Sequence, residues 1–340
     1  MMEMVKLNNA DRYRKQFEQV RDEVGKVIVG YDDVIDDFFI CLITGGHILL
    51  EGVPGIAKTT MIKVFTKAVG LDYERIQFTQ DMLPADISGH YYYDQKNGEF
   101  ELRKGPVFAQ VLMADEINRA PPKTQSSLIE AMQEKQVTIE GKTLRLPDPF
   151  LVIATRNPIE TEGVYPLPEA QIDRFMIKSE MGYVSPGKEL QMLQNKNDGV
   201  GKKKSSGSQT DDELAKVNQV GKDFGHEIKG LHEGVFVSDK VLEYIRDIIL
   251  ETRKVEELVL GASPRAGEQL LYASKAYAVI QGRDYVIPDD VKMVSEKVLP
   301  HRLILSVEAE LEDLTEVQVL DDILEKRVEA PKGDFKSDQS

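Results

Sequence analysis

The chain contains the stretch HILLEGVPGIAKT at residues 47–59, and the fold can be inferred from it. The apolar start of this stretch, residues 47–50, is typical of a buried strand. A glycine-containing turn follows, and apolar residues on a helical period then predict a helix over residues 58–69 that stops at Gly70. A strand, a turn and a helix in direct succession indicate a parallel α/β sheet.

The turn has the pattern of a loop that binds nucleotide phosphates, because residues 52–59 read G-x-x-x-x-A-K-T between a strand and a helix. Backbone N–H groups of such a loop surround the phosphates. We expect Lys58 to neutralise the β and γ oxygens and the Thr59 hydroxyl to hold magnesium. Ala57 replaces the usual glycine, so we expect a negative φ there. The candidate nucleotide-binding residues in this turn are Gly52, Pro54, Gly55, Ile56, Ala57, Lys58, Thr59 and Thr60.

A second apolar run, residues 111–114, ends in the acids Asp115 and Glu116. In a nucleotide site Asp115 would fix magnesium, and Glu116 would polarise the attacking water. Acids at the end of one strand are common, but together with the phosphate-binding turn they predict a magnesium–nucleotide site.

Three further side chains extend this prediction. Asn157 follows the predicted strand 150–154 and is placed to contact the γ-phosphate or the hydrolytic water. Arg174 could act as an arginine finger in a neighbouring subunit's site. Arg265 lies in the first turn of a predicted helix, where it could reach the phosphates and couple hydrolysis to domain movement.

The rest of the chain predicts a second, helical part. A strand is expected over residues 73–78 and a β-hairpin over 134–146. Helices are expected to begin at Ser238, Ser263 and Pro288. Residues 202–208, with three lysines, predict a mobile surface loop. We therefore expect a nucleotide-binding α/β domain at 1–183, a flexible connecting segment at 184–213, a smaller all-α lid domain at 214–331 and a disordered tail at 332–340.

Composition excludes several classes of protein. The 340 residues are 41% apolar and 30% charged, which supports a folded core. The net charge of −15, from 43 basic and 58 acidic residues, argues against a dedicated DNA-binding protein. Cys41 is the only cysteine and reads as a buried small hydrophobe, so a disulfide scaffold is excluded and a reducing cytoplasm is expected. The sequence also predicts neither a signal peptide nor a membrane span.

Taken together, these motifs resemble the MoxR family of AAA+ ATPases. The resemblance covers residues 24–305, and residues 51–59, 115–120, 154–158, 173–175 and 261–265 carry it. It implies a P-loop AAA+ core with a parallel sheet flanked by helices, followed by the lid. It also implies the following roles: Walker A at Lys58 and Thr59, Walker B at Asp115 and Glu116, sensor 1 at Asn157, the arginine finger at Arg174 and sensor 2 at Arg265. Adenine contacts are implied near Val29 and Gly30. The next residue is Tyr31, where the family often has Gln.

The resemblance further implies ATP and Mg²⁺ as cofactors and a ring that is usually hexameric. The implied activity is chaperone-like remodelling or maturation of partner proteins, often ones with von Willebrand factor A domains. The net charge of −15 argues against nucleic acid as a partner.

Two other interpretations of the sequence remain open. Another AAA+ branch could be present, either a magnesium-chelatase-like motor subunit or a DNA-translocating helicase. The net charge argues against the helicase, although Lys142 and Arg145 of the predicted hairpin leave a weak case for it. A scaffold that binds ATP without hydrolysing it is disfavoured, because binding alone would not require Glu116, Asn157 and Arg174 together.

Overall fold

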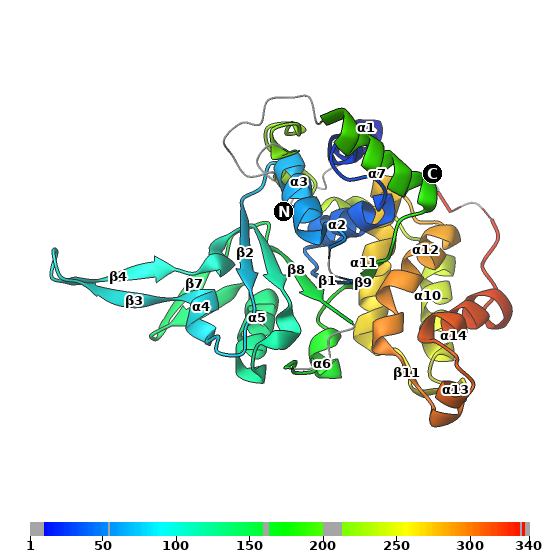
Figure 1. Ribbon diagram of the computed structural model, residues 1–340. Helices are drawn as coiled ribbons and strands as arrows, with labels where there is room; N and C mark the ends of the chain where they lie inside the picture. Colours follow the sequence, from blue (N-terminus) through cyan, green and yellow to red (C-terminus); the bar gives the residue numbers. More distant parts are fainter. Residues whose placement is uncertain (1–9, 54, 159–162, 200–212, 334, 337–340) are drawn as a thin grey trace.

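The computed structural model describes residues 10–53, 55–158, 163–199, 213–333 and 335–336. A five-stranded sheet in the order β2-β5-β8-β1-β9 forms the centre of the first part (Figure 1), and every neighbouring pair in it is parallel. The carboxyl ends of all five strands therefore lie along one edge, and the predicted parallel sheet is confirmed. The strands are β1 (Ile48–Gly52), β2 (Tyr73–Gln77), β5 (Val111–Asp115), β8 (Leu151–Arg156) and β9 (Ile177–Met181).

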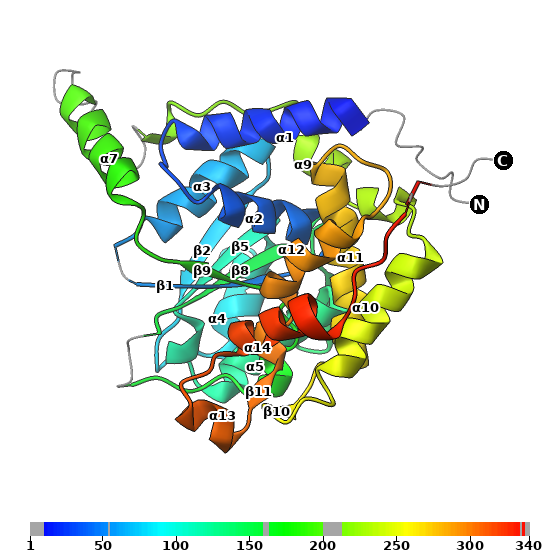
Figure 2. The same ribbon diagram turned by 90° about the vertical axis from the view of Figure 1, so that its right-hand side faces the viewer.

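Helices cover both faces of this sheet, so its strands β1 and β5 are buried on both sides. On one face, Ile48 and Leu50 pack in a core with α1, α2 and α3. On the other face, Leu49 packs in a second core with α5. Cys41, on α2, is buried as predicted. The helices are α1 (Ala10–Gly25), α2 (Asp32–Thr44), α3 (Lys58–Val69) and α5 (Pro122–Glu134), and Figure 2 shows the first three stacked on one side.

Two antiparallel hairpins leave the sheet on the same side (Figure 1). The predicted hairpin is confirmed as β6 (Gln136–Ile139) and β7 (Lys142–Arg145). The other, β3 (Gly89–Asp94) and β4 (Glu99–Lys104), was not expected from the sequence. It follows α4 (Pro84–Ser88) and precedes the short turn η1 (Pro106–Phe108). Its strands are largely exposed on both faces, so they lack the alternation that marks a strand with one buried face.

The second part is helical, as predicted, with one small ribbon between β10 (Leu258–Leu260) and β11 (Ile304–Leu305). The Ser263 hydroxyl caps α11 by accepting the N–H of Ala266, which confirms the expected helix start. The helical elements are α9 (Phe224–Glu227), η3 (Leu231–Gly234), α10 (Asp239–Glu251), α11 (Pro264–Ile280), α12 (Pro288–Val298), η4 (Pro300–Arg302), α13 (Val307–Leu311), α14 (Glu316–Asp322) and η5 (Ile323–Arg327).

The segment between the two parts contains α7 (Pro186–Gly199), which projects away from the rest of the fold (Figure 2). Residues 200–212, with the lysine-rich stretch, lie outside the described residues, as do 334 and 337–340 of the tail. Among the helices that the structure describes, none is long and apolar enough to cross a membrane.

The helical part packs beside the sheet on the α2 side. Helix α11 contacts α2 and α1, and α12 contacts the edge strand β9. A buried carboxylate marks this joint, because Asp37 of α2 accepts the Ser179 hydroxyl of β9 at 2.6 Å and lies 3.7 Å from the Lys297 ammonium of α12.

Candidate nucleotide site

The phosphate-binding turn lies at the carboxyl edge of the sheet, between β1 and α3. The Lys58 ammonium donates to the Gly52 carbonyl at 2.6 Å, which holds the lysine folded over the turn. Gly55 and Ala57 both have positive φ, 86° and 65°. The expectation of a negative φ at Ala57 is therefore wrong. The reversal from β1 into α3 requires the left-handed conformation, and its cost for alanine is only about 1–2 kcal/mol.

Residues 29–31 lie close to this turn through the segment that follows β9. The Tyr31 hydroxyl donates to the Gly182 carbonyl at 2.7 Å, just beyond β9. Gly30 has a φ of 91°, and a Cβ there would stand 3.1 Å from Val184. Gly52 is equally confined, since a Cβ there would stand 2.7 Å from the Met181 carbonyl. The loop with Val29 and Gly30 thus borders the phosphate-binding turn through the segment after β9.

The two acids at the end of β5 are held by neighbouring strands. Asp115 accepts the Thr155 hydroxyl of β8 at 2.5 Å and the Arg75 guanidinium of β2 at 2.6 Å. The backbone N–H of Glu116 donates to the same threonine hydroxyl at 2.9 Å. Asp115 therefore has a fixed orientation at the carboxyl edge.

Glu116 is held in an unusual backbone conformation, with a φ of 56°. Its carboxylate accepts the Gln77 amide at 3.0 Å and lies 2.9 Å from the Arg119 guanidinium. A non-glycine residue at positive φ is strained, and such strain clusters at functional sites. The two contacts orient the carboxylate at the carboxyl edge.

Asn157 lies at the same edge. It follows β8, whose residue Arg156 pairs in register with Glu51 of β1. Its side chain is buried. The structure thus brings Lys58, Asp115, Glu116 and Asn157 together at one edge. Arg75, Gln77, Arg119 and Thr155, which hold the two acids, were not identified from the sequence. Only the positions of Arg119 and Thr155, inside the motifs 115–120 and 154–158, gave a signal.

The oxygen-rich edge fits a magnesium ion. Magnesium is usually bound through one or two carboxylates or hydroxyls together with waters and substrate phosphates. Thr59 and Asp115 supply such oxygens. Within the described ranges no cluster of three His, Cys, Asp or Glu side chains could hold a metal by itself.

Arg174 lies at the opposite, amino edge. It follows α6 (Glu169–Ile172), and its guanidinium donates to the Ala170 carbonyl at 3.1 Å. Two residues later, the Met176 N–H donates to the carbonyl of His47, just before β1. The five residues of β1 thus separate Arg174 from the phosphate-binding turn, a distance of about 16 Å at about 3.3 Å per residue.

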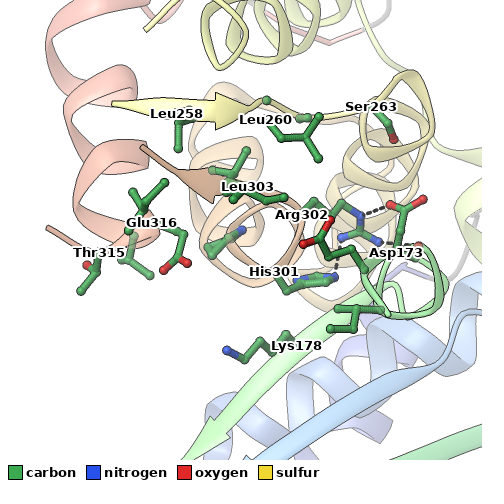
Figure 3. Close-up of a pocket in the computed structure, with 18 of the residues that line it drawn as sticks. Asp173, Lys178, Leu258, Leu260, Ser263, His301, Arg302, Leu303, Thr315 and Glu316 are labelled. Atoms are coloured by element: carbon green, nitrogen blue, oxygen red, sulfur yellow. Dashed lines mark hydrogen bonds and ion pairs between the residues drawn. The ribbon is translucent and has the colours of Figure 1, made fainter. Parts of the chain in front are cut away.

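Arg265 lies in the lid, in the first turn of α11. The loop before it, with Ser263, lines a cavity of about 1330 Å³ between the core and the lid, together with Asp173 (Figure 3). Burial lowers the pKa of Arg302 to about 10, and the positive charge of Arg265 adds to that shift, so the two arginines lie within electrostatic reach. Arg265 therefore lies near Arg302, which contacts the segment that carries Arg174.

Comparison with known proteins agrees with this architecture. A family model described as "ATPase family associated with various cellular activities (AAA)" matches residues 47–177, and one described as an AAA lid domain matches residues 250–323. The chain is 41% identical over 312 residues to "Chaperone MoxR1" of Mycobacterium tuberculosis, covering 89% of this chain and 79% of that protein. It is 42% identical over 304 residues to YeaC of Bacillus subtilis, covering 89% and 91%.

A solved structure from Cytophaga hutchinsonii, provisionally classed as an ATPase, superposes with a TM-score of 0.84 at 41% identity, covering 95% of this chain and 97% of that one. The match extends through the core and the lid. The chain belongs to the MoxR family of AAA+ ATPases.

Proposed function

We propose that this ATPase depends on magnesium and works as a hexameric ring, in which Arg174 and Arg265 of one subunit complete the nucleotide site of the next. The observation that carries the proposal is the separation of Lys58 and Arg174 by the length of the sheet. An arginine finger acts within hydrogen-bond reach of the transferring phosphoryl group. Arg174 cannot meet that requirement in its own chain without a large rearrangement.

At the carboxyl edge, this chain's residues would bind the nucleotide and activate water. The N–H groups of the turn and the Lys58 ammonium would hold the phosphates, with the base beside Val29 and Gly30. Thr59 and Asp115 would hold the magnesium ion, whose charge neutralises phosphate oxygens when it is bound. Glu116 would accept a proton from the attacking water, and Asn157 would orient that water or the γ-phosphate.

At the amino edge, two arginines would face a neighbouring subunit. The guanidinium groups of Arg174 and Arg265 would stabilise the charge that spreads over the phosphoryl oxygens in the transition state. Because Arg174 does not reach the phosphate-binding turn of its own chain, a single subunit would bind ATP but hydrolyse it slowly. Assembly would then switch hydrolysis on.

For the biological role, we propose chaperone-like remodelling or maturation of partner proteins in the cytoplasm. The printed name of the Mycobacterium tuberculosis relative, a chaperone, supports this role. Proteins with von Willebrand factor A domains are the proposed clients. The acidic net charge makes nucleic acid a poor substrate.

The experiment that tests assembly-dependent hydrolysis measures specific ATPase activity against protein concentration, with size followed by light scattering in the same samples with and without Mg-ATP. We expect specific activity to rise as the larger assembly forms. A monomer that hydrolyses ATP equally well at every concentration would exclude the shared site.

A further inference from the structure

Arg302 is a buried cation that joins the lid to the core. Its side chain is only 2% exposed, and its Nε lies 2.8 Å from an Asp173 carboxylate oxygen. One Nη donates to the Phe175 carbonyl at 2.5 Å, and the other to the Met176 carbonyl at 3.3 Å. Figure 3 shows Arg302 directed toward Asp173 at the wall of the cavity between the two parts.

These partners flank Arg174 on both sides. Asp173 precedes it, and Phe175 and Met176 follow it. A guanidinium is planar, with its donors in a fixed fork, so several simultaneous bonds to one segment fix the direction of its backbone. The conformation of the turn that carries Arg174 is therefore tied to a residue of the lid.

On its other side, Arg302 contacts two lid helices. It donates to the Val298 carbonyl at the end of α12 and to the side chain of Gln269 in α11. Helix α11 carries Arg265 in its first turn. One buried guanidinium thus connects the segment with Arg174 to the helix with Arg265.

We propose that Arg302 is a positioning residue that presents Arg174 to the nucleotide of the neighbouring subunit. This inference rests on the proposed function. Arg302 acts through Arg174 and does not itself contact the nucleotide. Buried ion pairs contribute little net stability but can specify geometry. Movement of the lid would shift the Arg174 turn through the same bonds.

The central variant is Arg302→Lys, which keeps the positive charge and loses the planar fork. We expect kcat to fall by about 10- to 100-fold, the loss typical of a catalytic group displaced by about 1 Å. The affinity of the isolated subunit for nucleotide should stay unchanged, because the phosphate-binding turn lies at the other edge. Asp173→Asn breaks the same ion pair from the core side and should act in the same direction, even if the Arg302 variant folds poorly.

A matched control is Arg283→Lys. Arg283 forms a two-pronged ion pair with Asp290 inside the lid, and its side chain is 22% exposed. Its contacts do not include the turn that carries Arg174. We expect this variant to unfold at a lower temperature with little change in kcat, which gives the cost of a broken lid ion pair alone.

The deciding measurement mixes Arg302→Lys subunits with Glu116→Gln subunits, each of which alone should hydrolyse ATP more slowly than the wild-type protein. The first type has an intact nucleotide site, and the second has an intact Arg174 and lid. We expect the mixture to exceed the sum of the two separate activities several-fold. Absence of this gain, or a normal kcat for Arg302→Lys, would overturn the inference. If Arg174→Ala itself hydrolyses ATP normally, the proposed function fails instead.

Discussion

The two edges of the central sheet differ in how their functional residues are arranged. At the carboxyl edge, Lys58, Asp115, Glu116 and Asn157 come from three adjacent strand ends, and bonds within the core hold the acids in place. At the amino edge, Arg174 and Arg265 come from two separate parts of the chain, and a buried arginine of the lid joins them. Within one subunit, Arg174 and the phosphate-binding turn therefore lie at opposite edges of the sheet.

Among the proposed variants, Arg174→Ala should have the greatest effect on hydrolysis. We expect hydrolysis to fall by about 10³-fold or more, the contribution typical of an arginine finger. The isolated subunit should bind nucleotide as before, because Arg174 lies at the other edge. Steady-state hydrolysis and titration with a fluorescent nucleotide measure the two quantities. Arg246→Ala, at an exposed arginine of α10, is the control and should change neither.

The opposite edge is probed by Glu116→Gln. Loss of a general base typically reduces the rate by about 10²- to 10⁴-fold. The amide keeps the size of the carboxylate and can still accept from Gln77, so nucleotide binding should be retained. Normal hydrolysis by this variant would remove Glu116 from the mechanism.

The contact of Asp37 with Ser179 and Lys297, where the lid packs beside the sheet, gives a pH-dependent prediction. Burial raises the pKa of Asp37 from its ordinary 3.8 to about 6, although Lys297 and the Ser179 hydroxyl oppose that shift. Because the folded state holds this proton more tightly than the unfolded state, the stability that Asp37 contributes is complete below pH 3.8 and is lost as the pH rises through 6. The whole change is up to about 3 kcal/mol.

Asp37→Asn should abolish this part of the decline in unfolding free energy. Urea denaturation between about pH 5.5 and 7.5 measures the upper part of it, above the isoelectric point near 5.0. Asp33→Asn is the comparison variant, because Asp33 is largely exposed and lies at a similar distance from Lys297; its charge adds to the raised pKa of Asp37, so this variant should reduce the decline without abolishing it. Equal slopes for the wild-type protein and Asp37→Asn would show that Asp37 is not the titrating group.

The last prediction concerns the phosphate-binding turn, where we expect only a small change in unfolding free energy. Ala57→Gly should raise the unfolding free energy by up to about 1 kcal/mol, because glycine adopts positive φ without strain but loses more chain entropy on folding. Ala68→Gly, inside α3, should lower it instead. Thermal unfolding compares the two, and a destabilised Ala57→Gly would contradict the strain that the backbone indicates.

The sequence predicted the carboxyl edge better than the amino edge for a physical reason. The strands that form the first edge are continuous apolar runs, and the residues after them belong to contiguous motifs such as 52–59. The position of the lid depends on contacts between distant segments, as between Asp37 and Lys297, so neither the place of Arg265 nor the bonds of Arg302 could be read from local pattern.

Two local predictions also failed or were missing. The predicted negative φ at Ala57 was wrong, because it relied on the cost of a methyl group at positive φ. That cost is only about 1–2 kcal/mol, and the reversal of the chain from β1 into α3 requires the left-handed conformation. The hairpin of β3 and β4 left no alternating pattern, since side chains such as Tyr92 and Phe100 are exposed. Alternation of apolar and polar residues indicates that one face of a strand is buried. This signal is therefore weakest where a segment projects from the core.

The most direct test of a site shared between subunits mixes Arg174→Ala with Glu116→Gln subunits. Each variant alone should be nearly inactive, for opposite reasons. In mixed assemblies an intact nucleotide site of the first variant can face the intact Arg174 of the second. We predict that the mixture hydrolyses ATP well above the sum of its components, with a maximum at an intermediate ratio. Activity equal to that sum at every ratio, in assemblies from which tagged subunits of one variant pull down the other, would contradict the shared site.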